Sequence, residues 1–81
     1  MKILIAEDDT ASRVFLAEVL KQLGYDVMAT TNGKEAWDAF QREHFPILIS
    51  DWMMPELNGL ELCRRIRAEG RAKYTYILLL T

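Results

Sequence analysis

The stretch ILISDWMMP, residues 47–55, decides the fold that we predict for this chain. Ile47 to Ile49 are consecutive aliphatic residues without alternation, which indicates a strand buried on both faces, as in a parallel sheet with helices on either side. Asp51 stands at the carboxyl end of this strand, and Pro55 then breaks the chain into a loop. Because ligands of open α/β sheets bind beyond the carboxyl ends of the strands, Asp51 is a candidate functional residue.

A second aliphatic run, residues 3–6, also ends in acid, at Glu7-Asp8-Asp9. If the two strands are neighbours, their carboxylates crowd at one edge of the sheet, repel one another and raise one another's pKa values. A cation would relieve that repulsion, and a few carboxylates with open water positions suit Mg²⁺. A second interpretation is that the three acids start a helix, where negative charge is favoured. The two interpretations overlap, because Asp9 could cap a helix while Glu7 and Asp8 bind metal.

Strand-like and helix-like segments alternate along the chain. The pattern predicts strands at 3–6, 25–30, 47–50 and 76–80, and helices at 10–23, 34–43 and 60–69. The apolar residues of the first helix recur at helical spacing, at Leu16, Val19, Leu20 and Leu23. This β-α-β-α-β-α-β order predicts a parallel sheet with right-handed crossovers.

Length and composition limit the classes of protein to consider. Eighty-one residues make at most one small domain, and a net charge of −2 gives no electrostatic reason to bind nucleic acid or an anionic membrane. A single cysteine, Cys63, excludes an internal disulfide and favours a reducing compartment. No apolar run approaches 18 residues. We therefore expect a cytoplasmic protein without membrane segments.

These acids and their spacing resemble the receiver domain of two-component response regulators. The resemblance rests on Glu7-Asp8 after the first strand, on Asp51 with Pro55 and Gly59 behind it, and on Thr81 after the last strand. It implies a flavodoxin-like three-layer α/β/α fold with the parallel strand order 2-1-3-4-5. It also implies a phosphoacceptor module, rather than an enzyme with a separate substrate, that takes a phosphoryl group from a sensor histidine kinase or a phosphotransfer protein.

The resemblance also assigns roles to individual residues. Asp51 would be the phosphoacceptor, and Thr81 the switch hydroxyl that turns toward the phosphoryl group. Asp8 would bind Mg²⁺ directly and Glu7 mainly through water, while the backbone carbonyl of Met53 would be a further ligand.

The sequence departs from the family pattern in one respect. The elements at residues 1–81 correspond to a partial receiver domain of four strands and three helices, without the fourth helix, fifth strand and fifth helix. The lysine that the family carries after its fifth strand has no counterpart, so we expect impaired phosphorylation of this chain. We also expect the fourth strand to lie at an open edge of the sheet and to favour self-association.

Three other functions are alternatives to the phosphoacceptor. A receiver-derived module that binds a partner without being phosphorylated is favoured by the missing lysine. A metal-dependent hydrolase on a similar sheet commonly needs a second acid two residues after its nucleophile, where this chain has Met53. A nucleotide-binding role is disfavoured because no glycine-rich loop follows the first strand.

Overall fold

A computed structural model describes residues 1–71 and 73–80. The elements alternate strictly between strand and helix, as the sequence predicts. In chain order they are β1 (Lys2–Ala6), α1 (Thr10–Gln22), β2 (Asp26–Thr30), α2 (Gly33–Arg42), β3 (Ile47–Asp51), α3 (Gly59–Glu69) and β4 (Tyr76–Leu80). The predicted bounds agree with these to within a residue or two.

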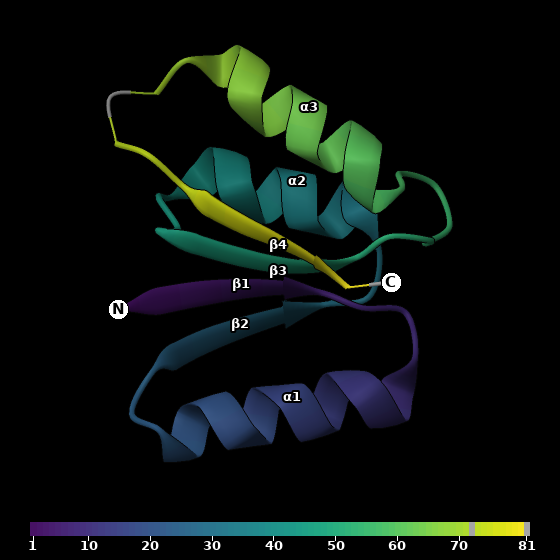
Figure 1. The fold of residues 1–81 in the computed structure, drawn as a ribbon, viewed down its shortest axis with the longest axis vertical. Coiled ribbons are helices and arrows are strands. Elements are labelled where there is room, and N and C mark those ends of the chain that lie inside the picture. The colour runs from purple at the N-terminus through teal and green to yellow at the C-terminus, as the bar shows by residue number, and fades with distance from the viewer. Residues whose placement is uncertain (72, 81) are drawn as a thin grey trace.

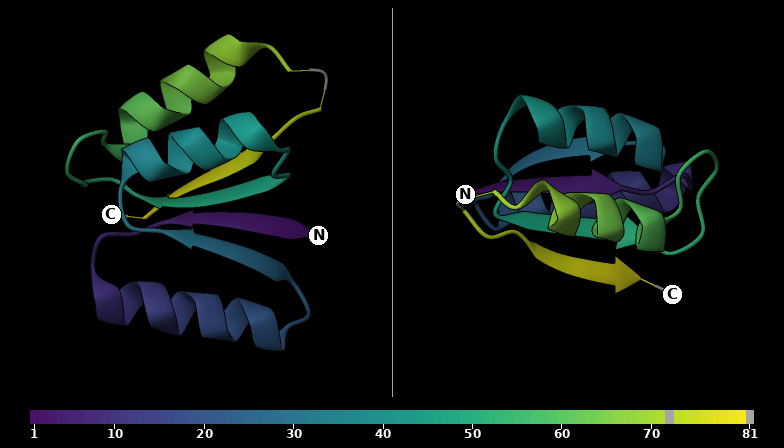
Figure 2. Two further views of the ribbon diagram at one scale, coloured as in Figure 1. Left: turned by 180° about the vertical axis from the view of Figure 1, so that it is seen from behind. Right: turned by 90° about the horizontal axis from the view of Figure 1, so that it is seen from above.

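The four strands form one parallel sheet in the order β2-β1-β3-β4. Figure 1 shows the three layers, with α1 on one face of the sheet and both α2 and α3 on the other. The predicted flavodoxin-like α/β/α architecture is therefore confirmed for these elements. All four strands point the same way, so their carboxyl ends meet at one edge (Figures 1 and 2).

Each helix begins at a polar residue whose side chain accepts a hydrogen bond from the first turn. Asp9 accepts from the backbone N–H of Ser12. Asn32 and Asn58 likewise each accept from the backbone N–H of the residue three positions further along the chain. These caps satisfy N–H groups that have no partner inside the helix. The helix α3 ends at Gly70, which adopts a left-handed conformation with φ of 63°.

The core is larger on the α2–α3 face than on the α1 face. Ten buried residues form the cluster between the sheet and α2 and α3, with Leu4, Leu48, Phe40, Phe45 and Leu62 fully or almost fully buried at its centre. The cluster under α1 contains three buried residues, Ile3, Ile5 and Ala17. Most of the stabilising apolar burial therefore lies on one side of the sheet.

Two predictions about burial were wrong, for one shared reason. Ile47 and Ile49 on β3 are only half-buried, although the sequence suggested a strand buried on both faces. Val19 on α1 and Leu23, which follows the last residue of that helix, are 37% and 68% exposed, although both belong to the predicted apolar stripe. Helix α1 packs over β2 and β1, so it leaves the same face of β3 and β4 partly open.

The longest helix in the part of the chain described has 13 residues, and none of these helices is long and apolar enough to span a bilayer.

Candidate metal and phosphoacceptor site

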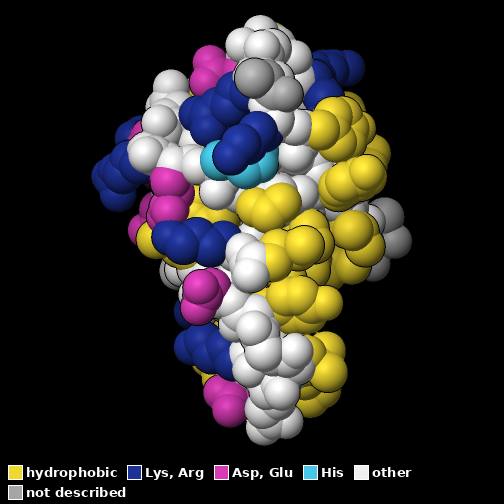
Figure 3. Space-filling view, turned by 90° about the vertical axis from the view of Figure 1, so that its left-hand side faces the viewer, with side chains coloured by type: hydrophobic (Ala, Val, Ile, Leu, Met, Phe, Trp, Pro, Cys, Tyr) yellow, Lys and Arg dark blue, Asp and Glu magenta, His cyan; other side chains and the backbone are white. Residues whose placement is uncertain are grey.

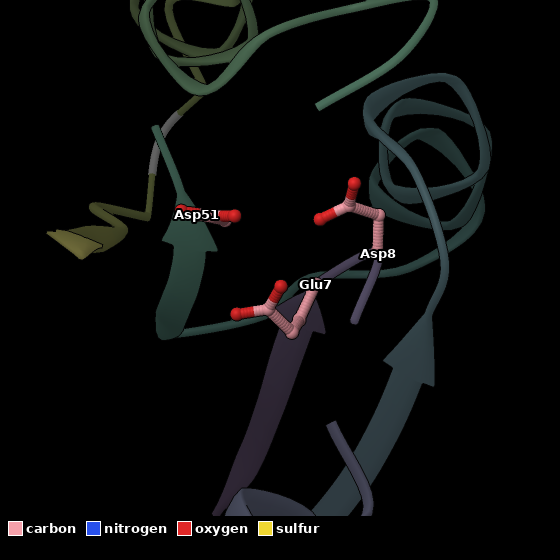
Figure 4. A group of neighbouring side chains, drawn as sticks. All are labelled: Glu7, Asp8 and Asp51. Atoms are coloured by element: carbon pink, nitrogen blue, oxygen red, sulfur yellow. The ribbon is translucent and has the colours of Figure 1, made fainter. Parts of the chain in front are cut away.

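Three carboxylates meet at the carboxyl edge of the sheet. Glu7 and Asp8 follow β1, and Asp51 is the last residue of β3. One oxygen from each lies within 4.8 Å of the others. Figure 4 shows the three side chains directed toward a common space. The convergence that the sequence predicts for these acids is present in the structure.

Strand pairing explains why these acids meet. β1 and β3 are adjacent and in register, with Ala6 opposite Ser50, so the residues that follow each strand emerge at the same edge. The backbone N–H of Glu7 continues the pairing and donates to the carbonyl of Thr30, 3.1 Å away. Position in the sheet therefore fixes where the acidic loop starts.

The three acids differ in their exposure to water. Glu7 is buried, Asp51 is half-buried and Asp8 is exposed. Burial raises the pKa of the Glu7 carboxyl, and the nearby charges of Asp51 and Asp8 raise it further, while a hydrogen bond from the backbone N–H of Asp9 opposes the rise. A cation beside these carboxylates would favour their charged forms.

The donor set fits a hard divalent cation. All three side chains offer oxygen, which Mg²⁺ prefers, and three carboxylates leave further coordination positions for water or a phosphoryl oxygen. Asp8, the exposed member, lies where solvent and an incoming ligand can reach it. The residues present therefore fit Mg²⁺.

The loop after Asp51 is held against the sheet by backbone contacts. The N–H of Trp52 donates to the carbonyl of Leu80, and the N–H of Gly59 donates to the carbonyl of Trp52. A side chain at position 59 could not fit, because its Cβ would lie 2.4 Å from the carbonyl oxygen of Asp51. Glu56 adopts a φ of 70°, which is unusual for a residue other than glycine. The loop is thus tightly specified around the candidate phosphoacceptor.

Two predicted site residues are not placed among the carboxylates by these contacts. The carbonyl of Met53, two residues beyond Asp51 in an exposed part of the loop, stays a predicted ligand. Thr81, the predicted switch hydroxyl, lies outside the described residues.

Sequence reasoning missed Arg13. It lies in the first part of α1 and donates from Nη1 to the carbonyl oxygen of Glu7, 3.0 Å away. Nothing in the sequence distinguishes Arg13 from an arginine on a solvated helix face.

The chain is thus a parallel α/β/α protein with a cluster of three carboxylates at the carboxyl ends of its strands. The chain belongs to the response regulator receiver domain family, which matches residues 3–81. This family is regulatory. The resemblance seen in the sequence is confirmed.

Curated relatives include chemotaxis proteins. The chain is 40% identical over 83 residues to a chemotaxis protein CheY homolog of Campylobacter jejuni and 39% identical to the chemotaxis protein CheY1 of Helicobacter pylori strain J99. All of the chain is covered in both comparisons, but only 64% and 67% of those proteins. The chain thus spans about two thirds of the length of these relatives.

Solved structures show the same fold. The chemotaxis response regulator CheY4 of Vibrio cholerae has a TM-score of 0.91 at 32% identity, covering 96% of this chain and 65% of that one. The response regulator protein TrrA of Thermotoga maritima, solved in complex with Mg²⁺ and BeF, has a TM-score of 0.85 at 31% identity, covering 96% of this chain and 68% of that one.

Proposed function

We propose that Asp51 accepts a phosphoryl group from a phosphohistidine of a sensor kinase or phosphotransfer protein, in a Mg²⁺-dependent reaction. The observation that carries the proposal is the meeting of Glu7, Asp8 and Asp51 within 4.8 Å. Membership of the receiver family and the Mg²⁺–BeF complex of TrrA support it. We also propose that the chain is cytoplasmic, because its single cysteine, Cys63, favours a reducing compartment.

The chemistry assigns one task to each acid. A carboxylate oxygen of Asp51 attacks phosphorus, the P–N bond to the donor imidazole breaks, and an acyl phosphate forms on Asp51. Bound Mg²⁺ would neutralise the phosphoryl oxygens during this transfer. Asp8 would bind the ion directly, Glu7 would act mainly through water, and the carbonyl of Met53 would complete the protein ligands.

Asp51 is suited to the role of nucleophile by its position. It is half-buried at the end of β3, and its Oδ1 accepts a hydrogen bond at 2.8 Å from the N–H of Trp52, which it shares with the carbonyl of Leu80. That contact orients the carboxylate and leaves its other oxygen available for attack. Thr81 would then report the phosphoryl group to the rest of the domain as the switch hydroxyl.

Phosphate incorporation tests this proposal. The chain is incubated with a small phosphodonor such as acetyl phosphate, with Mg²⁺ or with EDTA, and incorporation is followed by mass spectrometry. We expect one Mg²⁺-dependent phosphoryl group that Asp51→Asn abolishes and Asp8→Asn strongly reduces. Asp38→Asn, which changes a half-buried acid on α2 outside the acidic cluster, serves as the matched control. Incorporation that persists in Asp51→Asn would contradict the assignment.

We also propose that the 81 residues alone react slowly. The chain has four lysines, and none of the ion pairs found among the described residues joins a lysine to Glu7, Asp8 or Asp51. The lysine that the family carries after its fifth strand would make one charge-assisted contact to a phosphoryl oxygen, and such a contact is worth about 2–4 kcal/mol. Without that lysine, transfer should be slower by roughly 30- to 800-fold. A rate equal to that of a complete receiver domain would contradict this. If no phosphorylation occurs at all, the chain is better described as a non-phosphorylated interaction module.

Self-association through β4 is the third part of the proposal. β4 pairs only with β3 in the described sheet, and its side chains Tyr76, Leu78 and Leu80 are 66%, 53% and 40% exposed. Figure 3 shows hydrophobic side chains gathered along one side of the molecule. An open strand edge and an apolar face favour pairing with a second copy.

Light scattering after size exclusion, at increasing concentration, tests self-association. We expect a mass above that of the monomer, and Leu78→Lys should restore the monomer. Val14→Lys, which places the same charge on an exposed site of α1, is the control. A monomer at all concentrations would rule out this part of the proposal.

A further inference from the structure

Arg13 ties helix α1 to the acidic loop. Its Nη1 donates to the carbonyl oxygen of Glu7 at 3.0 Å, and its Nη2 lies 3.4 Å from the hydroxyl oxygen of Thr10. Arg13 is half-buried, whereas Glu18 and Lys21, the other charged residues of α1, are exposed. It therefore reaches back over the first turn of its own helix and holds the main chain of a candidate metal ligand.

With this contact, both backbone polar groups of Glu7 have a hydrogen-bond partner. The N–H of Glu7 is held by the carbonyl of Thr30 on β2, and the carbonyl of Glu7 is held by Arg13 on α1. Because a peptide group is planar, fixing the Glu7 carbonyl also fixes the nitrogen of Asp8 and the direction in which its Cα leaves the plane. Arg13 thereby constrains where the Asp8 carboxylate starts.

The loop has few other restraints at this point. The N–H of Asp9 donates to the Glu7 carboxylate at 3.1 Å, and Asp9 itself caps α1. In both contacts the acceptor is the side chain of an acid in the loop itself. Arg13 is thus the described side chain outside the acidic loop that bonds directly to the backbone between the two metal ligands of that loop.

Resting on the proposed Mg²⁺ site, we propose that Arg13 is a positioning residue that sets the Glu7–Asp8 peptide for metal binding. A purely electrostatic role predicts the opposite effect on substitution. Removing a positive charge near three carboxylates would strengthen the binding of a cation, whereas removing a positioning contact would weaken it. The sign of the change in Mg²⁺ affinity therefore separates the two roles.

Mg²⁺ alone is the probe, with calorimetry and tryptophan emission as readouts, since Trp52 is the residue next to Asp51. We expect Arg13→Met to weaken Mg²⁺ binding by roughly tenfold, in line with the loss of other residues that orient metal ligands. Arg13→Lys, which keeps the charge and one donor, should recover part of that loss. Lys21→Met removes the same charge from the last turn of the same helix and should change the affinity less than twofold.

A second readout reports on the peptide itself. In metal-free protein, the amide NMR signal of Asp8 should move in Arg13→Met, while that of a β4 amide such as Leu78 should not. Unfolding measured in EDTA shows whether each variant is folded, and Arg13→Lys keeps the test open if Arg13→Met does not fold.

The outcomes separate this inference from the proposed function. Mg²⁺ binding that is lost in Asp8→Asn but unchanged or tighter in Arg13→Met overturns the role of Arg13 alone. Binding that is absent from the unaltered chain, or unaffected by Asp8→Asn, overturns the metal site and the role of Arg13 together.

Discussion

Replacing Asp51 by asparagine should stabilise the metal-free protein. Two unit charges no more than 4.8 Å apart repel by at least about 0.9 kcal/mol at the dielectric constant of water, and by roughly twice that at an effective value near 40. Asp51 is half-buried and Glu7 is buried, so the repulsion that this substitution removes should be about 1–2 kcal/mol. In a domain of this size, each kcal/mol raises Tm by roughly 4–8 °C. Asparagine keeps the acceptor for the N–H of Trp52, so little else is lost.

Magnesium should reverse the order of stability. An ion that binds only the folded state at a hundred times its Kd stabilises that state by about 2.7 kcal/mol, which exceeds the repulsion of about 1–2 kcal/mol, and Asp51→Asn removes one of its ligands. Thermal and urea unfolding of both proteins in EDTA and in excess Mg²⁺ would measure this, with Asp38→Asn as a control. Asp38 forms an ion pair with Lys34 of the same helix, so losing its charge should not stabilise the protein. Equal effects of Asp51→Asn with and without Mg²⁺ would refute the reasoning.

Three further predictions concern the loops around the site. The N–H of Ser12 lowers the pKa of Asp9, so the charged form of Asp9 stabilises the fold above the ordinary value of 3.8. Asp9→Ala should therefore destabilise the protein at neutral pH. Urea unfolding across pH should show the difference in stability shrinking below pH 3.8. A constant difference would contradict this. Glu56→Gly should stabilise the protein by about 1 kcal/mol, as measured by chemical unfolding, because glycine adopts the positive φ of this position without strain. A loss of stability would show that the Glu56 side chain contributes more than its backbone conformation costs. Gly33→Ala should destabilise by about 2–3 kcal/mol or more, because its Cβ would lie 1.8 Å from the carbonyl oxygen of Leu57; a Tm within 2 °C of the unaltered chain would contradict that clash.

The order of elements and the acidic site could be predicted because each depends on local patterns. Unbroken aliphatic runs indicated β1, β3 and β4, and helical spacing indicated the helices. The acids converge because parallel neighbours end at one edge, which is a rule of topology that the sequence order implies. Asp9 was predicted as a possible cap of α1, and it is one.

Features that depend on which surfaces meet could not be predicted. Val19 and Leu23 fit an apolar stripe, but the position of α1 over β1 and β2 leaves them exposed. The positive φ of Glu56 has no sequence signal, since a glycine would be expected there. Arg13 was missed because its partner is a backbone carbonyl, and backbone acceptors leave no mark on residue type.

The unequal size of the cores on the two faces of the sheet determines which part of the site we expect to unfold first. Subglobal opening in native-state hydrogen exchange should begin with α1, which covers three buried residues, before the elements around the ten-residue cluster. Glu7 and Asp8 are linked to α1 through Arg13, whereas Asp51 belongs to β3 at the better-packed side. A fluctuation that releases α1 would therefore loosen two acids while leaving the third in place. A cation bridging all three would slow exchange in α1, although it touches no residue of that helix.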